Sequence, residues 1–235
     1  MQWSSAADTH VGNFRNHNED SVFASSANGL WLVAEGMGGH NAGEYASEAI
    51  AQSLSEVTLT DSLADCVDAI EDRLLEVNDH LREHARTFAD GATVGSTVVV
   101  AIARGNVGVV MWAGDSRLYR LRNQKFELLT RDHNPIGDLY EEGAVTESEM
   151  LSTDTNVITR AVGGQRDLHL DVAVFDILAG DTFLLCSDGL YREIDPQGLT
   201  GALSLPVDEA VSSLMARCLS GAARDNVSLV VTRAA

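Results

Sequence analysis

The sequence has a single lysine among its 235 residues, Lys125, and this scarcity excludes several classes of enzyme. Phosphate-binding P-loops, kinase active sites and Schiff-base enzymes each need a lysine at a fixed place, whereas Lys125 follows Asn123-Gln124 in an expected surface turn. Positive charge is scarce in general, because 35 Asp and Glu oppose 16 Lys and Arg and leave a net charge of −19. That charge repels nucleic acid and anionic membrane surfaces, so we expect neither as a partner.

Cysteine and long apolar runs are scarce as well. Cys66, Cys186 and Cys218 lie far apart and form no CxxC pair, which predicts reduced, buried thiols and not a zinc site or a disulfide framework. No apolar run is long enough to cross a bilayer, and the segment after Met1 lacks the basic start and apolar stretch of a signal peptide. These absences favour a cytoplasmic protein, and a monomer is the default expectation.

The rest of the composition is typical of a folded domain. Hydrophobic residues make up 45% of the chain, and with three prolines, no repeat and no low-complexity linker we expect residues 1–235 to form a single domain. Apolar and β-branched runs predict strands at 21–26, 30–34, 96–103, 107–112, 117–121, 126–130, 170–175, 182–186 and 227–232. Apolar residues at three- and four-residue steps predict helices at 42–54, 62–88 and 207–219. Strands grouped apart from helices indicate an α+β fold.

Carboxylates stand at the mouths of five expected strands, namely Asp20, Glu35, Asp115, Asp188 and Asp225. If they converge at one rim of a sheet, they repel one another unless cations lie between them. Oxygen-only ligands favour Mg²⁺ or Mn²⁺ over zinc or copper. Each acid taken alone is better explained as the cap of a surface turn, so this pattern by itself gives only weak support for a metal site.

A series of short motifs favours the metal site. In chain order they are RNHNED at 15–20, VAEGMGGH at 33–40, GST at 95–97, GDSR at 114–117, DH at 132–133, NVITRAVG at 156–163, SDGL at 187–190 and DNVS at 225–228. The series resembles the metal-dependent protein phosphatases of the PPM family, also called type 2C, in their compact bacterial form. The resemblance extends from about Thr9 to Thr232, nearly the whole chain.

The resemblance implies an α+β fold in which a β-sandwich of two mostly antiparallel sheets is flanked by helical layers, in the order α-β-β-α, with a metal centre at one end. It implies hydrolysis of phosphoserine and phosphothreonine in proteins by a metal-bridged water. The implied cofactors are two Mn²⁺ or Mg²⁺ ions, with a third ion more weakly held. The implied partners are phosphorylated proteins and a cognate cytosolic Ser/Thr kinase system that the phosphatase opposes.

The family's metal ligands carry over position by position. Glu35 occupies the place of the aspartate that bridges both metals, and the backbone carbonyl of Gly36 would ligate one of them. Asp188 and Asp225 would hold the other metal. Asp20 would act mainly through metal-bound water.

The resemblance assigns roles to further residues of the site. Asp115 matches the residue that, with Asp188, helps to bind the third metal. Arg15 matches the arginine that grips the substrate phosphate, as a planar guanidinium can bind two phosphate oxygens at once. His40 is a candidate general acid for the leaving oxygen, or a residue that stabilises its glycine-rich loop. The segment from Asp138 to about Thr155 corresponds to a variable flap, which we expect to be mobile.

Glu35 departs from the family pattern, which has aspartate at the bridging position. The extra methylene keeps the charge but moves the carboxylate outward by about one carbon–carbon bond, a large displacement for a two-metal bridge. The alternative to a fully active phosphatase is therefore a catalytically weakened or inactive relative that binds phosphoproteins.

Other histidines and arginines have simpler interpretations. The segment 80–84 matches the HxxEH pattern of some zinc peptidases, but His80 and His84 lie in a charged stretch that favours a solvated helix face. We expect His133 to be structural. For Arg117 and Arg160 we expect ion pairs that support the acidic rim in preference to phosphate binding.

Overall fold

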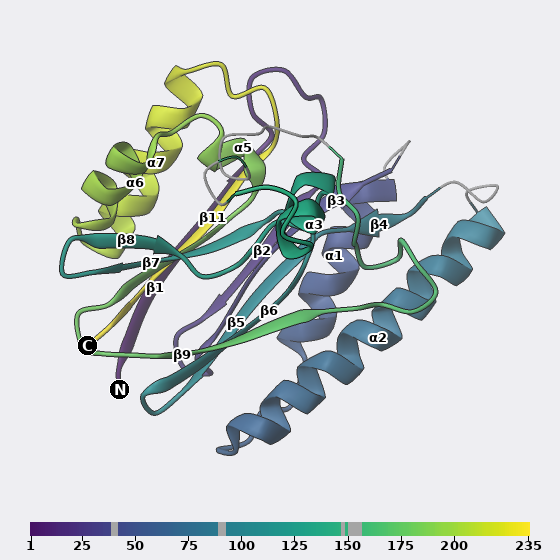
Figure 1. Cartoon of the computed structure of the whole chain (residues 1–235), viewed down its shortest axis with the longest axis horizontal. Coiled ribbons are helices and arrows are strands. Elements are labelled where there is room, and N and C mark those ends of the chain that lie inside the picture. The colour runs from purple at the N-terminus through teal and green to yellow at the C-terminus, as the bar shows by residue number, and fades with distance from the viewer. Residues whose placement is uncertain (39–41, 89–92, 147–148, 150–156) are drawn as a thin grey trace.

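A computed structural model describes residues 1–38, 42–88, 93–146, 149 and 157–235. Two antiparallel sheets stack face to face between two helical layers, and Figure 1 shows the four layers side by side. The α-β-β-α sandwich predicted from the resemblance is therefore confirmed. No helix in the described part of the chain is both long and apolar enough to cross a membrane.

The strands of each sheet come from distant parts of the chain. The first sheet has the order β1 (Trp3–His10), β11 (Val227–Ala234), β10 (Thr182–Cys186), β7 (Arg117–Arg122) and β8 (Lys125–Leu128). The second has the order β2 (Asp20–Ser25), β3 (Leu30–Met37), β5 (Val98–Arg104), β6 (Val107–Ala113) and β9 (Asp171–Asp176), and the short β4 (Gly95–Ser96) also pairs with β3.

The core has three apolar layers, one between each sheet and its helices and one between the two sheets. Side chains that alternate between the two faces of the central strands fill these layers. In β3, Leu32 and Ala34 face the helices α1 (Ala42–Ser55) and α2 (Leu63–Phe88), whereas Trp31 and Val33 face the other sheet. Successive side chains of a strand point to opposite faces, so a strand covered on both faces is apolar throughout. The first five residues of β3, Leu30 to Ala34, are accordingly all buried, and the less buried positions begin with Glu35 near the end of the strand.

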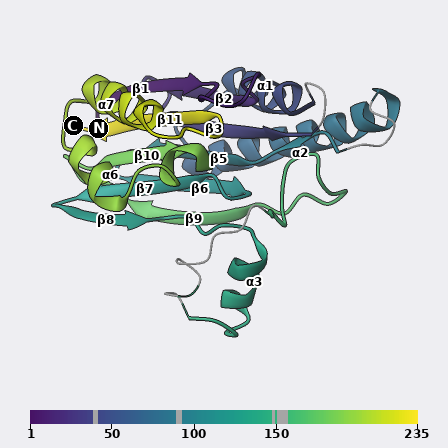
Figure 2. The same cartoon turned by 90° about the horizontal axis from the view of Figure 1, so that it is seen from above.

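Two helical pairs close the sandwich. In α2 the buried residues recur at three- and four-residue steps, as the sequence predicts, and the Ser62 hydroxyl oxygen accepts the Asp65 N–H at 3.3 Å as an N-terminal cap. The first sheet is covered by α6 (Pro196–Leu203) and α7 (Val207–Ser220). A further helix, α3 (Pro135–Glu141), projects from one side of the sandwich (Figure 2).

The strand β1 and the short helix α6 are not predicted by the sequence pattern. The residues of β1 are mostly small or polar and give little apolar alternation, yet all eight of them pair with β11. Pairing with a strand from the other end of the chain, and not local propensity, therefore determines this element.

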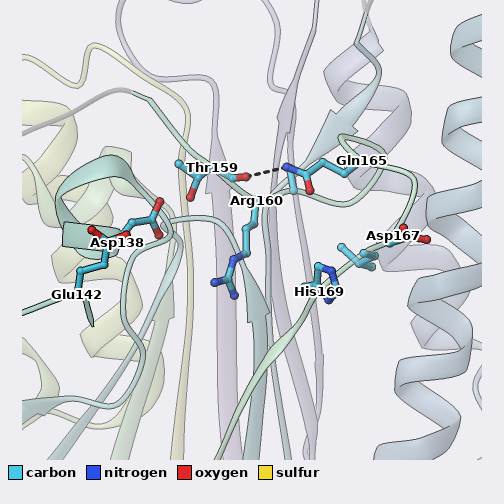
Figure 3. A pocket seen from close by; sticks show the side chains of 9 residues that line it. Asp138, Glu142, Thr159, Arg160, Gln165, Asp167 and His169 are labelled. Atoms are coloured by element: carbon cyan, nitrogen blue, oxygen red, sulfur yellow. Dashed lines mark hydrogen bonds between the residues drawn. The ribbon is translucent and has the colours of Figure 1, made fainter. Parts of the chain in front are cut away.

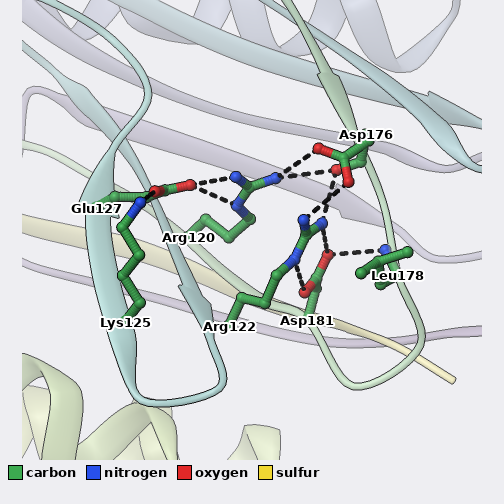
Figure 4. A network of polar contacts seen from close by, with 7 residues as sticks. All are labelled: Arg120, Arg122, Lys125, Glu127, Asp176, Leu178 and Asp181. Atoms are coloured by element: carbon green, nitrogen blue, oxygen red, sulfur yellow. Dashed lines mark hydrogen bonds and ion pairs between the residues drawn. The ribbon is translucent and has the colours of Figure 1, made fainter.

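An ion-pair network ties the two sheets together at the end away from Asp188 (Figure 4). Arg122 on β7 binds Asp181 through two hydrogen bonds of 2.7 and 2.6 Å and also reaches Asp176 on β9 at 2.8 Å. Lys125 pairs with Glu127 at 2.8 Å and is otherwise exposed, so the single lysine lies on the surface as predicted.

Candidate metal centre and phosphate site

Strand register brings the predicted carboxylates to one end of the sandwich. Asp20 begins β2 and stands directly opposite Glu35 of β3. In the other sheet, β10 ends at Cys186, and the antiparallel β11 begins beside that end. Asp188, in the first turn of α5 (Asp188–Tyr191), and Asp225, just before β11, are therefore neighbours.

Asp115 reaches the same end through a tight turn after β6. Gly114 has a φ of +112°, and a side chain there would overlap Thr97. His133 fixes the turn from behind, because its Nδ1 accepts the Gly114 N–H at 3.1 Å while its own backbone N–H donates to the Gly114 carbonyl at 2.9 Å. His133 is buried and, as predicted, structural.

Gly36 is a glycine because backbone approaches it from two sides. A Cβ at this position would overlap the carbonyl oxygens of Gly43, in the first turn of α1, and of Glu19. The Gly36 N–H donates to the Glu19 carbonyl at 2.9 Å. The place of Gly36 beside Glu35 at the cavity fits the predicted carbonyl ligand, whose role stays a prediction.

These residues line a cavity of about 790 Å³. Its described lining includes Gly36 and ten charged residues, seven carboxylates and three guanidiniums: Glu19, Asp20, Glu35, Asp115, Asp188, Glu193, Asp225, Arg15, Arg192 and Arg224. The excess of four negative charges equals the charge that two divalent cations carry. All of the predicted metal-site side chains and Arg15 therefore meet in one place.

The carboxylates of the cavity are in an unfavourable state as bare anions. Burial raises the pKa of Asp20 to about 7, and the nearby charges of Asp188 and Asp225 act in the same direction. Burial also raises the pKa of Asp115 to about 7 and that of Glu35 well above its usual range. Both carboxylate oxygens of Asp20 and Oδ1 of Asp188 are buried without a hydrogen-bond partner.

Arginines hold three of the carboxylates. The Arg15 Nη2 lies 2.8 Å from Asp225 Oδ2, and this hydrogen bond raises the pKa of Arg15. The Arg192 Nη1 lies 3.1 Å from Asp188 Oδ2, and its Nη2 lies 3.9 Å from Asp115 Oδ2. Within the described ranges, no three His, Cys, Asp or Glu side chains form a group that could hold a metal ion as they stand.

The donor set nevertheless fits divalent cations of the Mg²⁺ or Mn²⁺ type. The donors are oxygens only, the cavity carries excess negative charge, and the buried oxygens of Asp20 and Asp188 lack partners that a cation would supply. Rotation of the arginine side chain can open the Arg15–Asp225 pair to a cation, since the Arg15 side chain is 54% exposed and that of Asp225 37%.

Two residues of the site are missed when the sequence is considered alone. Asn226 is one of them: its Oδ1 accepts the Glu19 N–H, and its Nδ2 donates to the carbonyls of Val11 and His17, each at 2.9 Å. These bonds anchor the loop that carries Arg15. All three partners are distant in sequence, so no local signal reveals this role of Asn226, although Asn226 belongs to the motif at 225–228.

Arg192 is the other missed residue, and it has a sequence signal. It follows Asp188 by four positions, the spacing at which opposite charges pair on a helix. This spacing is informative only if a helix is known to begin at Asp188. The helix α5 has only four residues, so apolar periodicity does not predict it.

The remaining histidines and arginines agree with the simpler interpretations. The His80 Nε2 lies 2.6 Å from the Tyr45 hydroxyl, and His84 stacks on the same tyrosine ring with centroids 4.2 Å apart. Arg117 binds Asp132 through two hydrogen bonds of 2.9 and 2.7 Å. Arg160 donates to Asp171 at 2.6 Å.

The flap region is described only in part. His40 lies outside the described residues, and so does most of the flap beyond Thr146. The described portion begins in α3, where the Asn134 side chain caps the helix by accepting the Gly137 N–H at 2.8 Å. A second cavity, of about 400 Å³, lies between Asp138 and Glu142 on one side and residues 159–169 on the other (Figure 3).

The sequence is similar to those of known protein phosphatases. Residues 4–139 match the family model described as protein phosphatase 2C. The serine/threonine protein phosphatase PstP of Mycobacterium tuberculosis is 32% identical over 228 residues, which cover 96% of this chain and 44% of PstP. The chain therefore spans less than half the length of that curated relative.

Solved structures match over nearly the full length of both chains. PppA, described as a key regulatory component of T6SS in Pseudomonas aeruginosa, has a TM-score of 0.91 at 40% identity and covers 100% of this chain and 99% of its own. The catalytic domain of PstP in complex with two manganese ions has a TM-score of 0.85 at 30% identity and covers 99% of this chain and 98% of its own.

Proposed function

This chain belongs to the protein phosphatase 2C family of enzymes, and from that premise we propose that it is a Mn²⁺- or Mg²⁺-dependent protein serine/threonine phosphatase. The observation that carries the proposal is the single cavity in which Asp20, Glu35, Asp188 and Asp225 converge beside Arg15. The related PstP catalytic domain, which binds two manganese ions, supports the choice of metal.

In this proposal the acidic residues hold two divalent ions. Glu35 has Asp20 of its own sheet opposite it and Asp188, which follows a strand of the other sheet, beside it. This position suits a ligand that bridges two ions. The backbone carbonyl of Gly36 would bind one ion, and Asp188 and Asp225 would bind the other. Bound divalent ions make water a nucleophile at neutral pH and neutralise charge on the phosphoryl group.

Arg15 is proposed to bind the substrate phosphate. It stands at the mouth of the cavity on a loop fixed by Asn226, with its guanidinium toward the carboxylates. If Asp225 held a cation, the guanidinium would be released and could bind two phosphate oxygens in a planar pair. Arg15 would thus orient the phosphoryl group, the carboxylates would hold the ions that activate water, and no serine or cysteine nucleophile is required.

A second candidate function is a phosphoprotein-binding relative with weak or no turnover. The observation that favours it is Glu35, whose Oε2 accepts the Asp188 N–H at 3.4 Å. The longer side chain is thereby directed toward α5. The Arg15 loop does not depend on this contact and would still bind a phosphorylated residue.

Hydrolysis of a phosphothreonine peptide distinguishes the two functions. We expect phosphate release with Mn²⁺, none after addition of a chelator, and recovery when Mn²⁺ is restored. Equal release with and without chelator would contradict the metal-phosphatase proposal. Absence of release together with metal-dependent binding of the phosphopeptide, measured by fluorescence anisotropy, would favour the binding relative.

Further proposals concern the setting of the activity. We propose that residues 1–235 act as one catalytic domain and remove phosphate that a Ser/Thr kinase has placed on cytoplasmic proteins. Three free, buried cysteines support a reducing compartment. Co-incubation with a kinase-phosphorylated protein, followed by mass spectrometry of the phosphosites, tests the opposition to a kinase.

A further inference from the structure

Arg192 lies against the two carboxylates that the family resemblance assigns to a third, weakly held metal. Its guanidinium is 3.1 Å from Asp188 Oδ2 and 3.9 Å from Asp115 Oδ2. Both carboxylates are largely buried, with 10% and 6% of their side chains exposed, whereas the Arg192 side chain is 28% exposed. A positive group of the protein itself thus lies on the outer side of the cavity.

One helical turn fixes this arrangement. The backbone N–H of Arg192 donates to the Asp188 carbonyl at 3.1 Å and closes α5, so the two side chains lie on the same helix face. Leu190, within the turn, is fully buried and anchors it in the core. The guanidinium is therefore attached to the rigid element that carries one of its carboxylates.

The backbone of Asp115, which carries the second carboxylate, contacts the same turn. The Tyr191 hydroxyl donates to the Asp115 backbone carbonyl at 3.1 Å, and the Arg117 guanidinium lies 3.7 Å above the Tyr191 ring. Arg117 is in turn held by two hydrogen bonds to Asp132. These contacts hold Asp115 beside the turn that carries Tyr191 and Arg192.

We propose that Arg192 is a built-in cation which neutralises Asp115 and Asp188 and competes with a divalent ion for the place between them. The proposal rests on the function proposed above, since it assumes two divalent ions deeper in the cavity. A divalent ion between these carboxylates would lie beside a fixed positive charge, which lowers its affinity. The guanidinium therefore takes the place of a third metal ion and does not bind the substrate phosphate.

Calorimetric titration of Mn²⁺ into the metal-free protein tests the proposal without relying on activity. The variants are Arg192→Gln, which removes the charge, and Arg192→Lys, which keeps it. Arg224→Gln is the matched control, because it removes one positive charge from the same cavity, and within the described residues Arg224 has no ion pair with Asp115 or Asp188. Thermal melting of each variant confirms that it is folded.

We expect two Mn²⁺ ions per wild-type chain and two in Arg192→Lys and Arg224→Gln. In Arg192→Gln we expect a third ion, bound at least about tenfold more tightly than any third ion in the wild type. Adding Asp115→Asn to Arg192→Gln should remove that third ion. This pattern would support the proposal.

Equal stoichiometry and affinities in the wild type and Arg192→Gln would overturn the proposal and leave the phosphatase function intact. The same holds if Arg192→Gln retains two ions but raises KM for a phosphothreonine peptide, because Arg192 would then bind phosphate. Failure of the wild type to bind any Mn²⁺ would instead contradict the proposed function, and the role of Arg192 would fall with it.

Discussion

Arg15 and Asp225 form an ion pair of 2.8 Å across the mouth of the cavity. Arg15 is the residue proposed to bind the substrate phosphate, and Asp225 is one of the proposed metal ligands. In the proposed function, a cation bound by Asp225 would make Arg15 available to the substrate phosphate. The exposed Arg15–Asp225 contact would then couple metal binding to phosphate binding.

Arg15→Ala should raise KM for a phosphothreonine peptide by about tenfold, roughly 1.4 kcal/mol, because the guanidinium binds phosphate in the ground state. Mn²⁺ affinity should not weaken, since Asp225 loses a competing partner. Steady-state kinetics at saturating Mn²⁺ and calorimetry measure the two effects. An unchanged KM together with an unchanged kcat would show that Arg15 is only structural.

Asp188→Asn and Asp225→Asn should each weaken Mn²⁺ binding and abolish turnover, because each removes an anionic ligand. Asp68→Asn is the control, since Asp68 is an exposed residue of α2 outside the cavity. Calorimetry and phosphate release are compared for the three variants. Undiminished Mn²⁺ affinity in both site variants would contradict the ligand assignment.

Glu35→Asp should raise kcat at fixed Mn²⁺ by at least roughly tenfold, or about 1.4 kcal/mol of transition-state stabilisation. The shorter side chain has one rotatable bond fewer and cannot bend toward the Asp188 N–H, so it is better ordered between two ions. The melting temperature without metal should barely change.

The matched control for Glu35 is Glu19→Asp, the same shortening in the same cavity, for which we expect no gain in kcat. If Glu35→Asp leaves kcat equal or lower, the site is adapted to glutamate, and the geometric argument is wrong.

The metal-free protein should become less stable as pH rises from about 6 to about 8. Asp20 and Asp115 have folded-state pKa values of about 7, against 3.8 as the ordinary value. Their protonation thus stabilises the folded state fully below about pH 3.8, and this contribution is lost as pH rises through about 7. The expected fall in melting temperature is at least about 3 °C, the shift that roughly 1 kcal/mol produces in a domain of this size.

Scanning fluorimetry in chelator measures this slope, and the double variant Asp20→Asn, Asp115→Asn should flatten it. The stabilisation produced by added Mn²⁺ should instead grow with pH, because the ligands must lose their protons. A metal-free melting temperature that is constant or rises over this range would show that the carboxylates are not protonated in the folded protein.

Local patterns were enough to predict the central strands and long helices. The buried face of α2 follows directly from apolar spacing, and strands such as β5 and β10 are apolar because both of their faces are covered. Once β2 and β3 are antiparallel neighbours, Asp20 and Glu35 must meet at one end, so this part of the acidic cluster follows from positions along the chain.

Contacts between distant segments were not predictable. The strand β1 depends on β11 for its existence, and Asn226 reaches the Arg15 loop through backbone carbonyls that no sequence pattern marks. Arg192 is hidden for another reason, since its pairing with Asp188 needs a helix of only four residues. Side-chain anchors of this kind become visible only when the tertiary structure is known.

Anomalous diffraction at the manganese edge, from crystals grown with Mn²⁺, tests the central claim most directly. We expect two anomalous peaks in the cavity, with Glu35 between them, Asp188 and Asp225 at one, and the Gly36 carbonyl at the other. The Arg15–Asp225 ion pair should then be broken. A cavity without peaks, in crystals whose Mn²⁺ binds elsewhere, would contradict the assignment of this acidic cluster as a two-metal centre.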